Sequence, residues 1–157
     1  MIVRWLLASL HLVALGVGFA AIWMRARSLG AVPGVGGVPD ARAFRRVFAA
    51  DAVWGLSALL WIGTGLLRAF GGYEKGSAYY LQNHMFWGKM TLLGLILLLE
   101  LWPMVTLVRW RVAFGRGQEI DTGPARALGR VSLAQAVLVI GMVFLASAMA
   151  RGMGQPG

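Results

Sequence analysis

The sequence predicts an all-α, polytopic membrane protein in which four transmembrane helices form one bundle. Hydrophobic residues make up 59% of the 157-residue chain and charged residues only 13%, whereas soluble domains contain about 25% charged residues. Four apolar stretches are each long enough for a helix that crosses a bilayer, which needs about 20 residues. A single aqueous core cannot hide so much apolar surface on so short a chain, so we expect one transmembrane domain over residues 1–157.

The four predicted spans cover residues 3–24, 49–70, 84–108 and 131–150. Each is too long for an ordinary strand, and leucine, valine and alanine dominate, as in helices. A cleaved signal peptide is the alternative for the first stretch. Its apolar segment is long and ends in Trp23, Arg25 and Arg27, which favours a retained span with a cytoplasmic stop.

Basic residues concentrate in the first and third connections between these spans. The middle connection has only Arg68 and Lys75, beside Glu74. Positively charged loops stay in the cytoplasm, so we expect a bacterial inner-membrane protein with both termini outside the cytoplasm. The basic residues of the first and third connections are Arg25, Arg27, Arg42, Arg45, Arg46, Arg109, Arg111, Arg116, Arg126 and Arg130.

The net charge of +9 therefore predicts membrane orientation rather than nucleic-acid binding, because the basic residues lie between apolar stretches instead of covering a surface. The chain contains no cysteine. This excludes disulfides, thiol catalysis and metal sites with cysteine ligands. The lipid bilayer is the expected partner, together with either a second copy of the chain or a larger membrane complex.

Ionisable residues inside apolar spans are costly, so each of them is a functional candidate. The predicted topology sorts these residues into two layers. The outer layer contains His11, His84 and Lys89, and the inner layer contains Asp51, Glu100 and the neutral Gln135. In the inner layer the carboxylates either pair with arginines or carry protons. We expect pairing, because the face between the two layers is apolar.

Helical periodicity predicts which faces of the first two spans lie inside the bundle. At 3.6 residues per turn, His11 and Arg25 share a stripe of polar and small residues on the first span. On the second span, Asp51, Gly55 and Gly65 share a similar stripe. Small residues allow membrane helices to pack closely, so we expect both stripes to face the interior.

The third span carries two polar stripes, one with His84 and Thr91 and the other with Lys89 and Glu100. The two stripes lie about 140° apart on a helix, so His84 and Lys89 are not expected to share a partner.

The outer layer suggests a haem b site. Neutral imidazoles from two helices can bind haem iron axially, which makes His11 and His84 the candidate cofactor and metal ligands. Lys89 or Arg4 would then meet a propionate. The alternatives are purely structural histidines, and a copper site, since histidine and methionine both suit copper. Lys89 and Glu100 are the candidate catalytic residues, but the sequence assigns no reaction to them.

Three segments carry a resemblance to known proteins. They are LHLVALGVGFAAIWMRARSL from Leu10, FRRVFAADAVWGLSALLWIGTGLLR from Phe44 and EKGSAYYLQNHMFWGKMTLLGLILLLELWPMVTLVRWR from Glu74. They resemble a family of short four-span bacterial membrane proteins that carries a domain-of-unknown-function label. A more distant likeness is to HemJ-type and CopD-type membrane proteins, which place a histidine in the first span and a lysine in the third, where this chain has His11 and Lys89.

The family resemblance implies a membrane location without a reaction, and the distant likeness implies porphyrin or copper handling. Two hypotheses follow. The chain is either a redox protein that handles haem b or a porphyrin, or a non-catalytic membrane subunit or scaffold that packs against a larger complex. A transporter is less favoured, because no matching pair of spans is broken by glycine or proline.

Overall fold

The computed structural model describes residues 1–32, 40–73 and 76–154, which form helices and no strand. The four long helices are α1 (Ile2–Gly30), α2 (Ala41–Phe70), α4 (His84–Gly115) and α5 (Ala125–Ala150), and the short α3 (Ser77–Leu81) lies between α2 and α4. All four long helices are apolar enough to cross a membrane. The predicted all-α fold with four transmembrane helices is therefore confirmed.

The helices extend beyond the predicted spans. α2 begins at Ala41, where Asp40 accepts a hydrogen bond from the backbone N–H of Arg42 at 3.0 Å and caps the helix. α4 continues to Gly115, and α5 already begins at Ala125. An apolar window marks the part of a helix that lies in hydrocarbon, whereas the helix itself continues until its backbone is capped.

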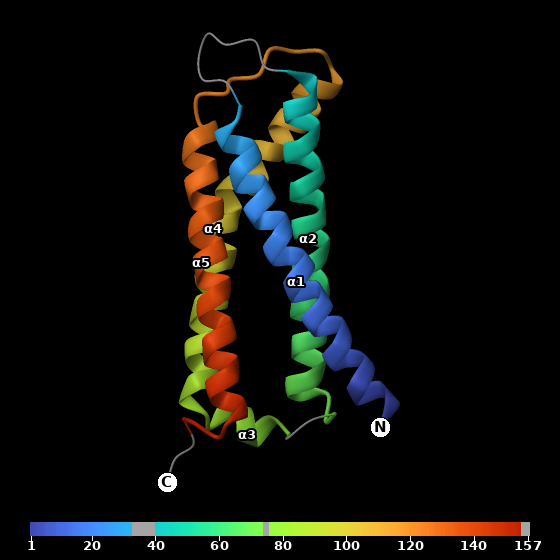
Figure 1. Ribbon diagram of the computed structural model, residues 1–157, viewed down its shortest axis with the longest axis vertical. Helices are drawn as coiled ribbons and strands as arrows, with labels where there is room; N and C mark the ends of the chain where they lie inside the picture. Colours follow the sequence, from blue (N-terminus) through green and yellow to red (C-terminus); the bar gives the residue numbers. More distant parts are fainter. Residues whose placement is uncertain (33–39, 74–75, 155–157) are drawn as a thin grey trace.

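The bundle has two distinct ends (Figure 1). At the end that we name the loop end, α1 connects to α2 and α4 connects to α5. At the opposite end, named the terminal end, lie both chain termini and α3. α1 packs mainly against α2 and α5, and α5 also packs against α4, whereas the backbones of α2 and α4 hardly approach each other.

Small and large residues set these different helix separations near the loop end. A side-chain carbon at Gly129 of α5 would lie 3.2 Å from the carbonyl oxygen of Ala26, so α1 and α5 are in close contact there. Aromatic rings instead fill the wider space between α2 and α4. Phe44 meets Trp110 edge-on at 5.8 Å and Phe114 at 5.7 Å between ring centroids.

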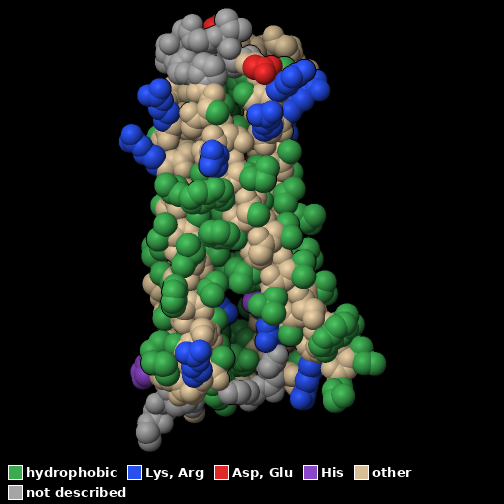
Figure 2. All heavy atoms as spheres, in the orientation of Figure 1, with side chains coloured by type: hydrophobic (Ala, Val, Ile, Leu, Met, Phe, Trp, Pro, Cys, Tyr) green, Lys and Arg blue, Asp and Glu red, His purple; other side chains and the backbone are tan. Residues whose placement is uncertain are grey.

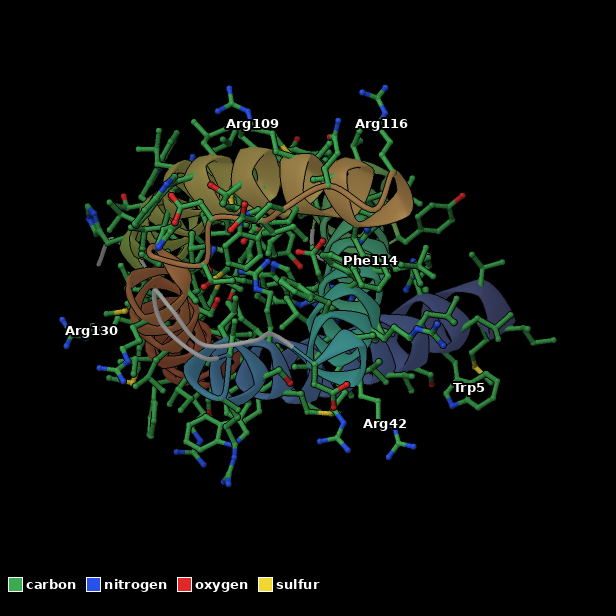
Figure 3. The ribbon with its side chains drawn as sticks, turned by 90° about the horizontal axis from the view of Figure 1, so that it is seen from above. Trp5, Arg42, Arg109, Phe114, Arg116 and Arg130 are labelled. Carbon is green, nitrogen blue, oxygen red and sulfur yellow. The ribbon has the colours of Figure 1, made fainter. Side chains whose placement is uncertain are left out.

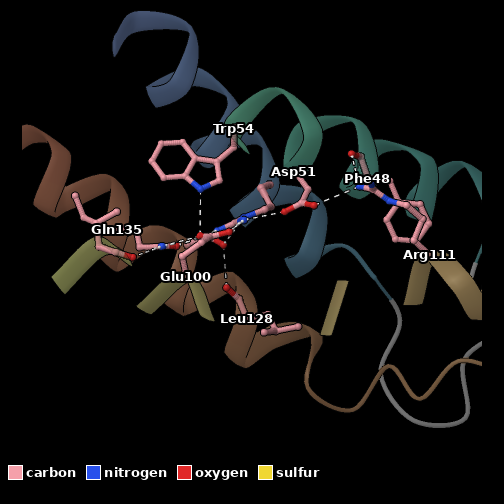
Figure 4. A network of polar contacts seen from close by, with 10 residues as sticks. Phe48, Asp51, Trp54, Glu100, Arg111, Leu128 and Gln135 are labelled. Carbon is pink, nitrogen blue, oxygen red and sulfur yellow. Dashed lines mark hydrogen bonds and ion pairs between the residues drawn. The ribbon is translucent and has the colours of Figure 1, made fainter. Parts of the chain in front are cut away.

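A fully buried arginine joins all four long helices in the loop-end half (Figure 4). Arg25 of α1 donates through Nε to Ser132 at 3.0 Å and through Nη1 to Asp51 at 2.9 Å. Nη1 and Nη2 also form a two-point contact with Glu100 at 2.7 and 2.8 Å, and Nη2 reaches Gln135 at 2.9 Å. These five bonds use all five N–H groups of the guanidinium.

The acceptors in this Arg25 network are themselves held in place. Glu100 also accepts hydrogen bonds from Trp54 Nε1 at 3.1 Å and from Gln135 Nε2 at 2.7 Å. Asp51 also accepts from Arg111 of α4 at 3.3 Å. Two arginines, Arg25 and Arg111, therefore face two carboxylates, so the pairing of the inner carboxylates with arginines that the sequence predicts is found.

The predicted buried stripe of α1 is confirmed at Gly18 and Arg25, both of which are buried. The predicted stripe of α2 is found only in part: Gly55 is exposed, whereas Asp51 and Gly65 are half-buried and contact Arg25 and His11 of α1. The most buried face of α2 instead follows Trp54, Ser57 and Trp61. Small residues therefore did not identify the whole interior face of α2. The large indole rings of Trp54 and Trp61 instead bridge the distance from α2 to α4.

On α4 the stripe with Lys89 and Glu100 faces the interior, where Ile96 between them is buried. The stripe with His84 and Thr91 is exposed. Seen from the loop end, the arginines labelled in Figure 3 all point away from the bundle, as expected of side chains that reach headgroups. They are Arg42, Arg109, Arg116 and Arg130.

A C-terminal turn closes against α4 at the terminal end. Asn83 is fully buried, caps α4 by accepting from the N–H of Met85 at 2.8 Å, and donates to the carbonyl of Met153 at 3.1 Å. The N–H of His84 donates to the carbonyl of Gly154 at 3.0 Å. Gly154 has a φ of +82°, and a side-chain carbon there would lie 2.8 Å from Asn83 Oδ1, so only glycine fits.

We expect Arg25→Ala to destabilise the bundle by about 3–5 kcal/mol, because it leaves two carboxylates without their main partner. The measurement is the free energy of unfolding by SDS titration in mixed micelles. Arg109→Ala is the matched control, since Arg109 is exposed, and it should leave the unfolding curve unchanged. Equal stability of the two variants would show that the Arg25 network does not hold the helices together.

Candidate functional site

A cavity of about 460 Å³ lies in the terminal-end half, between the α1–α2 pair and the α4–α5 pair. Its volume is in the range of small-molecule sites. Every helix contributes to its wall, and most of the lining is apolar or aromatic. Figure 2 shows a hollow between α1 and α5 on the front face, with a histidine and a basic side chain visible inside it.

The few polar groups of this wall are basic or neutral. His11 comes from α1, Arg68 from α2 and Lys89 from α4, and the phenols of Tyr79 and Tyr80 come from α3. None of the described lining residues is acidic. The cavity therefore combines an apolar body with a few basic and neutral polar groups.

The imidazole of His11 is fixed by a hydrogen bond to Thr64 of α2, with 2.9 Å between Nδ1 and Oγ1. Thr64 Oγ1 also lies 2.6 Å from the carbonyl oxygen of Leu60 and 3.1 Å from that of Trp61. Carbonyl oxygens only accept, so the single hydroxyl proton is used on them and Oγ1 accepts from Nδ1–H. A neutral His11 therefore carries its proton on Nδ1 and a lone pair on Nε2.

Packing also restricts the His11 ring. A side-chain carbon at Gly65 would lie 3.1 Å from its Cε1, so the ring rests on the backbone of α2. The ring of Trp61 lies beside it, at 5.8 Å between centroids and tilted by 35°. A histidine oriented through Nδ1 in this way resembles a metal-ligating imidazole held by its second nitrogen.

Two hydrogen-bond donors of the wall lack acceptors. Lys89 lies about 7–8 Å deeper along α4 than His84, at 1.5 Å per residue, and has no hydrogen-bond or ion-pair partner among the described residues. The indole N–H of Trp61, a residue only 7% exposed, also has none. Unpaired donors in an apolar environment are costly, so both groups favour a ligand with anionic or accepting oxygens.

The predicted site residues separate into three places. His11 and Lys89 line the cavity. His84 is exposed on α4 and does not line it, so the two histidines are not brought together there. Glu100 belongs to the Arg25 network. Among the described residues, no group of three or more histidine and acidic side chains could hold a metal ion.

Sequence reasoning missed three residues of the site. Thr64 gave no signal, because a threonine inside an apolar span commonly bonds its own helix. Trp61 lies beside the predicted stripe of the second span and not on it. Arg68 was counted only as a loop charge, yet it lies on the last turn of α2 and reaches the cavity. All three residues lie on α2, and the sequence does not show which face of α2 is turned toward α1.

The chain matches one known protein family along nearly its whole length. The sequence model of the family described as "Predicted membrane protein (DUF2214)" matches residues 3–154. The chain belongs to this family. No curated protein and no solved structure matches it. The DUF2214 match runs from α1 to the C-terminal turn, and so includes every described residue of the cavity wall.

We expect Thr64→Val to change the state of His11 without changing the fold, because valine has nearly the same shape but cannot accept from Nδ1–H. In protein labelled with 15N-histidine, the His11 signals should move away from those of a pure Nδ1–H tautomer. Thr91→Val is the matched control, since Thr91 bonds only its own helix through Trp87 at 3.0 Å. Unchanged His11 signals in Thr64→Val would mean that the hydroxyl does not fix the ring.

Proposed function

We propose that this membrane protein binds an amphiphilic anion within the bilayer, in the cavity between its two helix pairs, and that haem b or a related porphyrin is the first ligand to test. The observation that carries this proposal is Lys89, an unpartnered lysine that shares the cavity with His11 and with no described acidic residue. A lysine inside a membrane protein usually pairs with an anion. A bound carboxylate or phosphate would provide one.

The apolar wall supports a large ligand body. Phe86 of α4, Tyr80 of α3 and Trp61 of α2 line the cavity together with aliphatic residues and methionines. Flat aromatic rings pack well against such side chains. A ligand with an extended apolar part and a few anionic oxygens fits the whole lining better than a small ion or a sugar.

His11 is the reason for placing haem first. Its Nε2 lone pair could bind haem iron, and Thr64 would hold the ring in place through Nδ1. Lys89 and Arg68 are suited to the propionates. Haem held there would supply one-electron redox chemistry. Since His84 lies outside the cavity, His11 is the histidine of the described wall that would hold the iron.

We further propose that the terminal end faces away from the cytoplasm of a bacterial inner membrane. The support is the arginine-rich loop end, where basic side chains point outward around the bundle, since positively charged loops remain in the cytoplasm. The cavity then lies in the outer half of the bilayer.

The ligand proposal predicts a coloured protein. Wild type purified in detergent from haem-replete cells should show a Soret band, with sharpened α and β bands after dithionite reduction. His11→Ala should lose these bands, and His84→Ala, the matched control, should keep them. Lys89→Met should weaken haem binding by about tenfold to a hundredfold, the effect of one lost charged hydrogen bond.

A wild-type protein that is colourless and takes up no added haem would overturn the haem assignment. If the same colourless protein also co-purified with a larger membrane complex and tolerated His11→Ala, the scaffold alternative would replace it.

The orientation predicts opposite behaviour of two reporters. Alkaline phosphatase fused after residue 157 should be active, because it folds only outside the cytoplasm, and green fluorescent protein fused there should remain dark. The same reporters inserted between α4 and α5, after Gly117, should give the reverse pattern. Fluorescence from the C-terminal fusion would show that the C-terminus lies in the cytoplasm, opposite to the proposed orientation.

A further inference from the structure

We infer that the ligand enters the cavity sideways from the bilayer, through an opening between α1 and α5, and is therefore a membrane-dissolved amphiphile rather than a water-soluble anion. This inference rests on the proposed function of the cavity and adds the class and the route of its ligand.

The side opening follows from residues that line the cavity and are also exposed on the outer surface. Leu12 of α1 is 63% exposed and Val143 of α5 is 44% exposed, yet both belong to the cavity wall. Ser147, one turn further along α5, is likewise exposed and lines the cavity. Figures 1 and 2 show α1 leaving α5 toward the terminal end, with the hollow between them.

Aromatic contacts obstruct the opposite side of the cavity. Phe70 of α2 meets Phe86 of α4 edge-on, at 6.2 Å between ring centroids. Phe86 also contacts Tyr80 of α3 at 5.6 Å. These rings connect α2, α3 and α4 near the terminal end and narrow the gap between α2 and α4. Leu66 and Phe70 of α2 also line the cavity and are about half exposed, so the opening between α1 and α5 is distinguished by the separation of these two helices rather than by exposed lining residues alone.

The terminal end of the cavity is also covered. Tyr79 and Tyr80 of α3 line the cavity at this end, and the Tyr79 hydroxyl donates to the carbonyl of Met149 at 3.1 Å, which ties α3 to the end of α5. The C-terminal turn is bound to Asn83 next to it. Entry from the aqueous side would require these contacts to break, whereas entry between α1 and α5 would not.

The chemistry of this route selects the ligand. Leu12 and Val143 at the opening are apolar and Ser147 adds one hydroxyl, so a hydrated ion would lose most of its water there with little compensation. Lys89 and the Trp61 N–H lie in the wall behind them. A molecule with an apolar body and one anionic end can partition into the outer leaflet, pass the opening and place its oxygens on these donors.

Cysteine labelling tests the route, because the chain has no cysteine of its own. Ala146→Cys places a thiol on the cavity wall at a half-buried position, and Met142→Cys places a second thiol on the same wall at a position only 2% exposed. The protein in phospholipid vesicles is treated with an apolar maleimide that dissolves in the bilayer, or with a charged methanethiosulfonate on both sides. The mass shift gives the labelled fraction.

Two controls calibrate the reagents. Val137→Cys lies on α5 at a 61% exposed position that does not line the cavity, and Met153→Cys lies beyond α5 at a 54% exposed position. The first reports access from lipid and the second reports access from water. We expect both cavity thiols to behave like Val137→Cys, with loss of labelling by the charged reagent. Adding Val143→Trp to fill the opening should slow only the cavity thiols.

Labelling of the cavity thiols by the charged reagent as readily as Met153→Cys would overturn the lateral route in favour of an aqueous entrance. Absence of labelling by either reagent would also overturn it, by showing that the cavity is closed. The labelling of these cysteine variants requires no bound ligand, so its results test the route whether or not haem binds.

Discussion

The bundle depends on one buried guanidinium. Arg25 is the single side chain that bonds to α2, α4 and α5 from α1, and its five donors all find acceptors. In hydrocarbon, lipid tails compete with apolar side chains for every apolar contact, so polar bonds and close packing provide much of the specificity between helices. The Arg25 network therefore fixes how the helices meet in the loop-end half. Toward the terminal end α1 leans away from α5, and the cavity lies in the space between the helix pairs.

The two polar layers differ in charge balance, and this difference separates structure from binding. Near the loop end, Arg25 and Arg111 face Asp51 and Glu100, so the charges cancel within the protein. A balanced, fully bonded cluster has no need of a ligand. In the cavity, basic groups face no described acid. The imbalance there is the physical reason for seeking an anion in that half.

Much of the fold was predictable from sequence, because length and hydropathy fix the spans of a membrane protein. Phase was harder. The interior face of α1 could be found from its polar stripe, whereas the most buried residues of α2, Trp54 and Trp61, lie beside its predicted stripe of small residues. In water, apolar residues turn inward. In a bilayer both surfaces of a helix are apolar, so only contacts with neighbours show which face is inside.

The same limit explains why the two histidines could not be distinguished in advance. Both are single imidazoles near the terminal end, and spacing gives no reason to separate them. Their positions in space do. His11 meets a hydroxyl of another helix whose own proton is already used, and this fixes its tautomer. His84 begins α4 on its exposed face, where lipid headgroups and water can satisfy both ring nitrogens. A candidate ligand inside a membrane is thus identified less by its residue type than by the polar partner that orients it.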